Sequence, residues 1–220
     1  MDARQLSEWG ARVKIKAWWT AVVLAVLVSI YAVIQYYVLG PERAGFVSMK
    51  LEEQELGWIW YGMLYVHVAG GASALAIGPF NLLQSIRNRH LKLHRIMGRV
   101  YMAGIAAGGL SGLYLAFEAT GGAVSTVGFL SLNVLWLVSA YMALKTIRVK
   151  QVEQHRRWMI RNYALTLAGV TLRLWLGMFV AAFGEENFTP SYMIIAWLCW
   201  IPNAIAAEWH IRRTRAARLT

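Results

Sequence analysis

Six long apolar stretches, separated by short polar segments, dominate the pattern of the chain. They run from Ala17 to Leu39, Trp58 to Leu83, Met97 to Phe117, Val124 to Leu144, Asn162 to Phe183 and Tyr192 to Trp209. A helix rises about 1.5 Å per residue, so about 20 apolar residues cross the roughly 30 Å of hydrocarbon in a bilayer. The pattern predicts an all-α integral membrane protein: a basic arm over 1–16, a single six-helix transmembrane domain over 17–209, and a basic tail over 210–220.

The composition supports this prediction. Apolar residues make up 58% of the 220 positions and charged residues only 15%, against about 45–50% and 25% in soluble proteins. The single cysteine, Cys199, excludes an intramolecular disulfide and a multi-cysteine metal site. Phosphate-binding glycine loops, Gly-x-Ser-x-Gly elbows and His-Glu-x-x-His helices are absent. The sequence therefore leaves open whether the protein is an enzyme.

The cations are distributed unevenly between the segments that join the spans. Except for Arg43, Lys50 and Arg173, every lysine and arginine lies in the amino-terminal arm, the second or fourth connection and the adjoining helix ends, or the tail. Because cationic residues near span ends stay on the cytoplasmic side, both termini are expected to be cytoplasmic, with the protein multi-pass in the cytoplasmic membrane. The net charge of +11 then indicates contact with anionic lipid headgroups, not nucleic acid.

Three polar residues occur at similar depths inside the predicted spans. His67 and Asn133 lie about nine residues, and Arg173 about ten, from the outer ends of their helices, which is roughly 13–15 Å. Ionisable groups in hydrocarbon usually face a cavity or a partner, so the three are expected to meet in one cavity. Two structural alternatives stay open. His67 could bond a neighbouring backbone carbonyl, and Arg173 could pair with Glu118 at the end of the third span.

Two further histidines, His94 and His155, precede helices that enter from the predicted cytoplasmic side. They could contact lipid headgroups, or they could form an axial pair for a haem. With His67, they are the candidate metal ligands. The candidate cofactor-binding residues are His67, Asn133, Arg173, His94 and His155.

Two patterns bear on how the helices pack. Gly104, Gly108 and Gly112 recur every four residues on one face of the third span, which indicates close approach of another helix, with a glycine-lined path as the alternative. The pattern Arg-x-Met-x-Arg-x-Tyr occurs over 95–101 and again over 157–163. It indicates either an internal duplication or the usual gathering of arginine and tyrosine at a cytoplasmic boundary.

Several of these residues resemble a known family. They are His67, Gly78-Pro79-Phe80, His94-Arg95-x-x-Gly98-Arg99-x-Tyr101, His155-x-x-Trp158-Met159-x-Arg161 and Arg173. From roughly Trp58 to Phe183, the chain resembles predicted bacterial membrane proteins catalogued as a domain of unknown function, of the DUF2306 type. The resemblance implies that these positions form a recurring pattern, but it supplies no activity. The chain also resembles, more faintly, the helical bundles of cytochrome b-type proteins. It departs from their pairs of haem-binding histidines, because the fourth span has no histidine at the level of His67. Phe129, Asn133 and Trp136 stand there instead.

These observations lead to one functional hypothesis and two alternatives. The main hypothesis is a buried His/Arg site that binds haem b or a quinone in membrane electron transfer. The alternatives are a small proton-coupled transporter of an anionic substrate, and a non-catalytic subunit or assembly factor of a membrane complex. A homo-oligomer or a larger membrane complex fits each of them.

Overall fold

The computed structural model describes residues 3–53 and 55–216, with side chains described from Trp18 onward except at positions 52 and 53. Six helical segments are long and apolar enough to cross a membrane, and the described residues contain no strand. The spans are Trp18–Val38, Trp58–Leu82, Leu91–Phe117, Gly122–Arg148, Val152–Phe183 and Glu185–Ala216. The prediction of an all-α protein with six spans is confirmed, whereas the side on which the termini lie stays a prediction.

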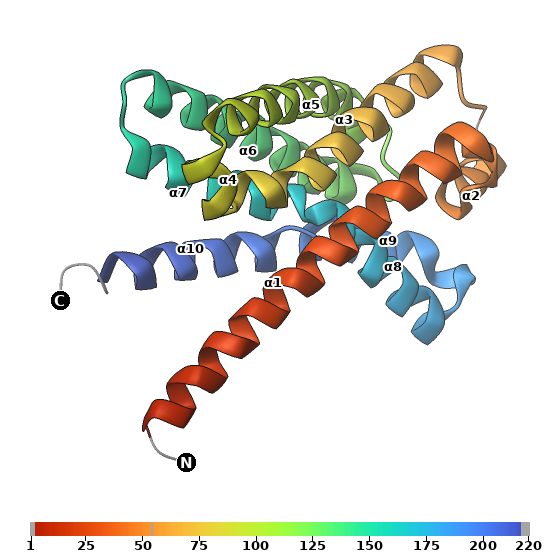
Figure 1. The fold of residues 1–220 in the computed structure, drawn as a ribbon. Coiled ribbons are helices and arrows are strands. Elements are labelled where there is room, and N and C mark those ends of the chain that lie inside the picture. Colours follow the sequence, from red (N-terminus) through yellow and green to blue (C-terminus); the bar gives the residue numbers. More distant parts are fainter. Residues whose placement is uncertain (1–2, 54, 217–220) are drawn as a thin grey trace.

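Long helices make up most of the bundle (Figure 1). Helix α1 (Ala3–Val33) continues into the π-helical turn η1 (Ile34–Val38), and α3 (Trp58–Leu82), α5 (Leu91–Phe117) and α6 (Gly122–Arg148) are unbroken. The predicted arm 1–16 forms the start of α1 from Ala3 onward, although its side chains and residues 1–2 lie outside the described part. The predicted tail continues α10 as far as Ala216, and 217–220 are likewise outside it.

The fifth and sixth spans are each built from two helices. The fifth joins α7 (Val152–Thr166) to α8 (Ala168–Phe183), and the sixth joins α9 (Phe188–Leu198) to α10 (Ile201–Ala216). Pro202 cannot donate a backbone hydrogen bond, so the helix is interrupted just before it. The Thr171 hydroxyl donates to the carbonyl of Cys199, and Asn203 Nδ2 donates to the same oxygen at 3.1 Å. Polar side chains thus satisfy backbone that the break exposes, as hydrocarbon requires.

Short helices cover the two ends of the bundle. The 3₁₀ turn η2 (Pro41–Arg43), helix α2 (Gly45–Glu53) and the turn η3 (Glu185–Asn187) lie at one end, and α4 (Gln84–Arg89) lies at the other. Figure 1 shows the start of α1 and the end of α10 at the end away from α2. We call the end with α2 and η3 the acidic end, and the end with α4, the start of α1 and the end of α10 the basic end. Most cations of the sequence therefore gather at one end, as the charge pattern predicts.

Helices α3 and α5 approach each other so closely that side chains are excluded. A Cβ added to Gly70 would lie 2.4 Å from the carbonyl oxygen of Gly104 and 2.6 Å from the amide nitrogen of Gly108. The predicted glycine seam is therefore a packing surface at Gly104 and Gly108, and its partner is the Gly70–Gly71 pair of α3.

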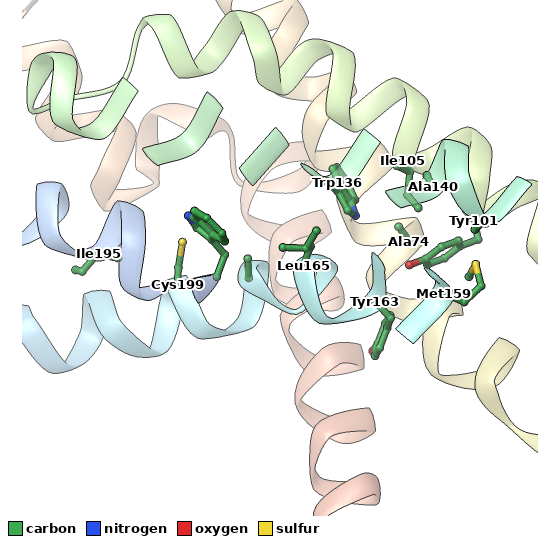
Figure 2. Close-up of a cluster of buried hydrophobic side chains, with 13 residues drawn as sticks. Ala74, Tyr101, Ile105, Trp136, Ala140, Met159, Tyr163, Leu165, Ile195 and Cys199 are labelled. Carbon is green, nitrogen blue, oxygen red and sulfur yellow. The ribbon is translucent and has the colours of Figure 1, made fainter. Parts of the chain in front are cut away.

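The core beneath α3 and α5 combines large apolar side chains with a buried polar network. Figure 2 shows Tyr101, Trp136 and Tyr163 in one cluster. The Tyr101 hydroxyl donates to Asn162 Oδ1 at 2.7 Å, and Asn162 Nδ2 donates to the carbonyl of Trp136 at 2.8 Å. A Cβ on Gly78 would meet the rings of Tyr101 and Tyr163, at 3.0 and 2.3 Å. The two tyrosines of the repeated Arg-x-Met-x-Arg-x-Tyr pattern therefore meet at one point of α3.

Candidate functional site

A cavity of about 750 Å³ occupies the half of the bundle toward the acidic end. Residues of α1, α3, α5, α6, α7 and α8 form its walls, and residues of α2 and α9 contribute near its end. Eight aromatic side chains line it: Tyr31, Tyr36, Phe46, Trp60, Phe129, Trp136, Phe188 and Tyr192. Its size falls within the usual range for ligand pockets, about 300–1,000 Å³.

His67, Asn133 and Arg173 all line this cavity. They come from α3, α6 and α8. The expectation that equal depth in the membrane would bring them to one cavity is thus met. Whether they bind a ligand there stays a prediction.

The imidazole of His67 is anchored to the neighbouring helix. Its Nδ1 lies 2.7 Å from the carbonyl oxygen of Gly108 on α5, across the glycine seam. A carbonyl oxygen only accepts, so Nδ1 must carry the proton of this hydrogen bond. The alternative in which His67 bonds a neighbouring backbone carbonyl is therefore present in the structure, and Nδ1 makes this bond. In the neutral ring, the lone pair then lies on Nε2, which is the nitrogen left to meet a ligand.

Gly112 of α5 makes room for two of the three polar side chains. A Cβ added there would lie 2.3 Å from Asn133 Oδ1 and 2.9 Å from His67 Nδ1. The amide of Asn133 is oriented by the bond from Nδ2 to the Phe129 carbonyl, at 2.9 Å. The third glycine of the seam thus belongs to the site, because it lets groups from α3 and α6 approach the same point of α5.

Arg173 forms no ion pair with a carboxylate that the structure describes. Its Nη1 donates to the carbonyl of Gly169 at 2.7 Å, and its guanidinium carbon lies 6.0 Å from the centre of the Tyr31 ring. No ion pair joins it to Glu118 or to any other residue that the structure describes. The proposed Arg173–Glu118 pair is therefore not formed, although both residues line the cavity.

Glu118 instead takes part in closing the acidic end. Its backbone carbonyl accepts a hydrogen bond from Nζ of Lys50 on α2. Lys50 is 4% exposed, so its stem is packed while its ammonium group holds α2 to the end of α5. This contact could not be predicted from the sequence, because a lysine in a short outer connection is usually solvated.

His94 and His155 lie at the basic end, and neither lines the cavity. Nδ1 of His155 lies 2.8 Å from the carbonyl of Ala143, whereas Nδ1 of His94 is buried without a hydrogen-bond partner in the described structure. No group of three or more potential metal ligands occurs among the described residues. The structure therefore separates these two histidines from His67.

A polar layer beneath the cavity was not identified from the sequence. The Thr166 hydroxyl accepts a bond from Trp136 Nε1 at 2.8 Å and lies 3.1 Å from the Tyr101 hydroxyl. Trp136 and Thr166 both line the cavity. Asn162 and Thr166 are four residues apart in an apolar span, which places them on one helix face. This four-residue spacing of two polar residues is the feature of the sequence from which the layer could have been predicted.

Comparisons with known proteins identify the family. The family described as predicted membrane protein (DUF2306) matches residues 64–211, which include most of α3, the whole of α5 to α9 and most of α10. No curated protein and no solved structure matches the chain. Because the match covers more than half of the sequence, the chain belongs to the DUF2306 family of predicted membrane proteins. With six spans, it is a multi-pass membrane protein, and the family resemblance in its sequence is confirmed.

Proposed function

We propose that this member of the DUF2306 family binds a quinol, the reduced form of a membrane quinone, as part of electron transfer in the bacterial inner membrane. One observation carries the proposal. An imidazole with its lone pair on Nε2 and a guanidinium that forms no ion pair with a described residue line the same aromatic cavity inside the bundle.

The tautomer of His67 discriminates between the two redox forms of a quinone. Because Nδ1 donates to Gly108, Nε2 of the neutral ring can accept a hydrogen bond but cannot donate one. A quinol hydroxyl donates to such an atom, whereas a quinone carbonyl cannot. The same lone pair on Nε2 is the position of the ring that could take up a proton from the hydroxyl.

Arg173 supplies hydrogen-bond donors for an oxygen of the ring. Of its five N–H groups, one is used by the carbonyl of Gly169 among the described residues. A guanidinium without an ion-pair partner in a low-dielectric site stabilises negative charge on a nearby oxygen, including the charge left when a hydroxyl loses its proton. The amide of Asn133, bonded through Nδ2 to Phe129, keeps Oδ1 as a further acceptor for a hydroxyl.

The aromatic walls suit a flat ring more than a small polar solute. Phe129 and Trp136 of α6 and Trp60 of α3 all line the cavity. Aromatic pairs of this kind contribute about 0.5–1.5 kcal/mol beyond the burial of area. A hydrophilic anion would gain nothing from such walls, so the transporter alternative is less well supported than a ring-shaped ligand.

A haem is the second candidate, since Nε2 of His67 could ligate iron and Arg173 could hold a propionate. The residues present fit only one protein ligand to the iron, because Asn133 and Trp136 occupy α6 where a second histidine would be needed. A bound haem would supply one-electron chemistry. The quinol makes fuller use of the polar atoms in the cavity, and we therefore favour it.

Calorimetric titration of the detergent-purified chain with a short-chain ubiquinol, under nitrogen, tests the proposal. The matching ubiquinone is the control ligand. We expect the quinol to bind at least about tenfold more tightly, the difference that one unmatched hydrogen bond produces. Arg173→Met and His67→Phe should each weaken quinol binding about tenfold or more. Arg148→Met, which removes the same charge outside the cavity, should leave binding unchanged.

Two results would contradict the proposal. One is the absence of saturable binding of either ligand, and the other is tighter binding of ubiquinone than of ubiquinol. Sharp absorption bands in the reduced purified protein, lost in His67→Phe, would replace the quinol with haem.

A further inference from the structure

A second pocket, of about 330 Å³, lies between α7 and α10 at the basic end. It shares no residue with the aromatic cavity. Its lining contains four arginines and one glutamate with three other side chains: Arg157, Arg161, Arg212, Arg215, Glu208, Gln154, Trp158 and Ile211. The lining of this pocket therefore carries a net positive charge, because arginines outnumber carboxylates in it.

One arginine is fixed as part of the pocket wall. Arg161 forms a two-point ion pair with Glu208, in which Nε donates to Oε1 and Nη2 donates to Oε2 at 3.0 Å. Its guanidinium also lies over the ring of Trp158, 4.7 Å from the ring centre. This pair joins α7 to α10, and it uses the only carboxylate in the lining.

The other arginines of the pocket are not engaged in this way. Arg157 contacts Glu153 at 3.5 Å, with side chains 30% and 44% exposed, and such exposed pairs contribute little. Arg212 and Arg215 form no ion pair with any residue that the structure describes. Three guanidinium groups around one small pocket match the tetrahedral oxygens of a phosphate group, which arginine binds through paired N–H donors.

The position of the pocket indicates where the phosphate comes from. The pocket lies where the fifth and sixth spans reach the basic end. Two tryptophans mark this level: Trp158 in the pocket wall, and Trp209, which is 62% exposed on α10. Tryptophan and arginine are typical of the layer of lipid headgroups, and basic pockets between helices there bind anionic heads.

We propose that the α7–α10 pocket binds the phosphate group of an anionic glycerophospholipid. The site is independent of the quinol cavity. It would join the outer surface of the bundle to one lipid molecule through α7 and α10, and it would hold that lipid more tightly than the bulk membrane does.

Native mass spectrometry of the detergent-purified full chain tests this inference. The probes are phosphatidylglycerol, phosphatidylcholine, diacylglycerol and inorganic phosphate. The double variant R157Q/R212Q removes two pocket charges, and the matched control K145Q/R148Q removes two charges of the same end outside the pocket. Arg212→Gln alone is a milder variant, because this side chain is exposed.

We expect one phosphatidylglycerol to be retained per chain, at least about tenfold more strongly than diacylglycerol. R157Q/R212Q should lose at least about tenfold in this retention, Arg212→Gln should lose part of it, and K145Q/R148Q should keep it. Competition by inorganic phosphate at millimolar concentration would support a phosphate site filled from solution as well as from lipid. Equal losses in the two double variants, or retention of diacylglycerol as strong as that of phosphatidylglycerol, would overturn the proposal.

Discussion

Replacing Gly112 with alanine probes the link between the packing of α5 and the candidate site. The new methyl group would lie 2.3 Å from Asn133 Oδ1 and 2.9 Å from His67 Nδ1, where ordinary contacts begin at 3.4 Å. The Asn133 oxygen would therefore have to move by about 1 Å and the imidazole by about half of that. Movement of Asn133 strains its hydrogen bond to the Phe129 carbonyl, at 2.9 Å. Movement of His67 strains its hydrogen bond to the Gly108 carbonyl, at 2.7 Å.

The expected loss follows from these contacts. Overpacking by one methyl group costs typically about 1–3 kcal/mol, and a weakened hydrogen bond falls within the same range. Because both displaced groups line the cavity, we expect the free energy of unfolding to fall by about 1–3 kcal/mol. Quinol affinity should fall about tenfold or more, since about 1.4 kcal/mol corresponds to a factor of ten.

Unfolding by sodium dodecyl sulfate in mixed micelles, followed by circular dichroism, measures the first quantity, and the ubiquinol titration measures the second. Gly177→Ala is the matched control. Gly177 lines the same cavity, but a Cβ there would meet nothing within 4 Å, so both quantities should stay within about 0.5 kcal/mol of the wild type. Wild-type stability and affinity in Gly112→Ala would refute the arrangement of His67 and Asn133 around this glycine.

Three further predictions concern the glycine seam, the membrane topology and the buried polar network. Gly70→Ala should prevent accumulation of folded protein, because its methyl group meets rigid backbone at 2.4 Å, whereas Gly71→Ala, with nothing within 4 Å, should fold normally by size-exclusion chromatography. Alkaline phosphatase fused after Glu185 should be active and after Lys150 inactive, as the positive-inside rule requires; the reverse pattern would invert the topology. Asn162→Leu should lower the free energy of unfolding by about 2–3 kcal/mol, because it leaves several buried polar partners unbonded; an unchanged unfolding curve would contradict the network.

The depth of polar residues could be read from the sequence, because helical rise converts position in a span directly into distance. His67, Asn133 and Arg173 were brought together in this way. Their partners could not be predicted, because a backbone carbonyl such as that of Gly108 has no signature in the sequence. The absence of an Arg173–Glu118 pair could not be predicted either, since the depth of a residue does not specify how its helix is rotated about the helix axis.

The glycine seam and the repeated tyrosines illustrate a second limit. Periodicity identifies the face of α5 that packs closely. Only the structure shows that Gly108 meets backbone, that Gly104 meets backbone and the Ser73 hydroxyl, and that Gly112 faces the side chains of Asn133 and His67. The two copies of the Arg-x-Met-x-Arg-x-Tyr pattern suggested duplication or a boundary motif. The structure adds that their tyrosines have a common packing role, since Tyr101 and Tyr163 both lie against Gly78.

The polar layer beneath the cavity bears on how a ligand would be held. Trp136 and Thr166 belong to both the cavity wall and the network that contains Tyr101 and Asn162. Tyr101 and Asn162 are fully buried, and a network whose members satisfy one another resists rearrangement. A ring that entered the cavity would therefore meet a preformed floor, so little binding energy would be spent on ordering α6 and α7. His67 and Arg173 line the same cavity, where hydrogen bonds to the backbone hold both side chains and Arg173 forms no ion pair with a described residue.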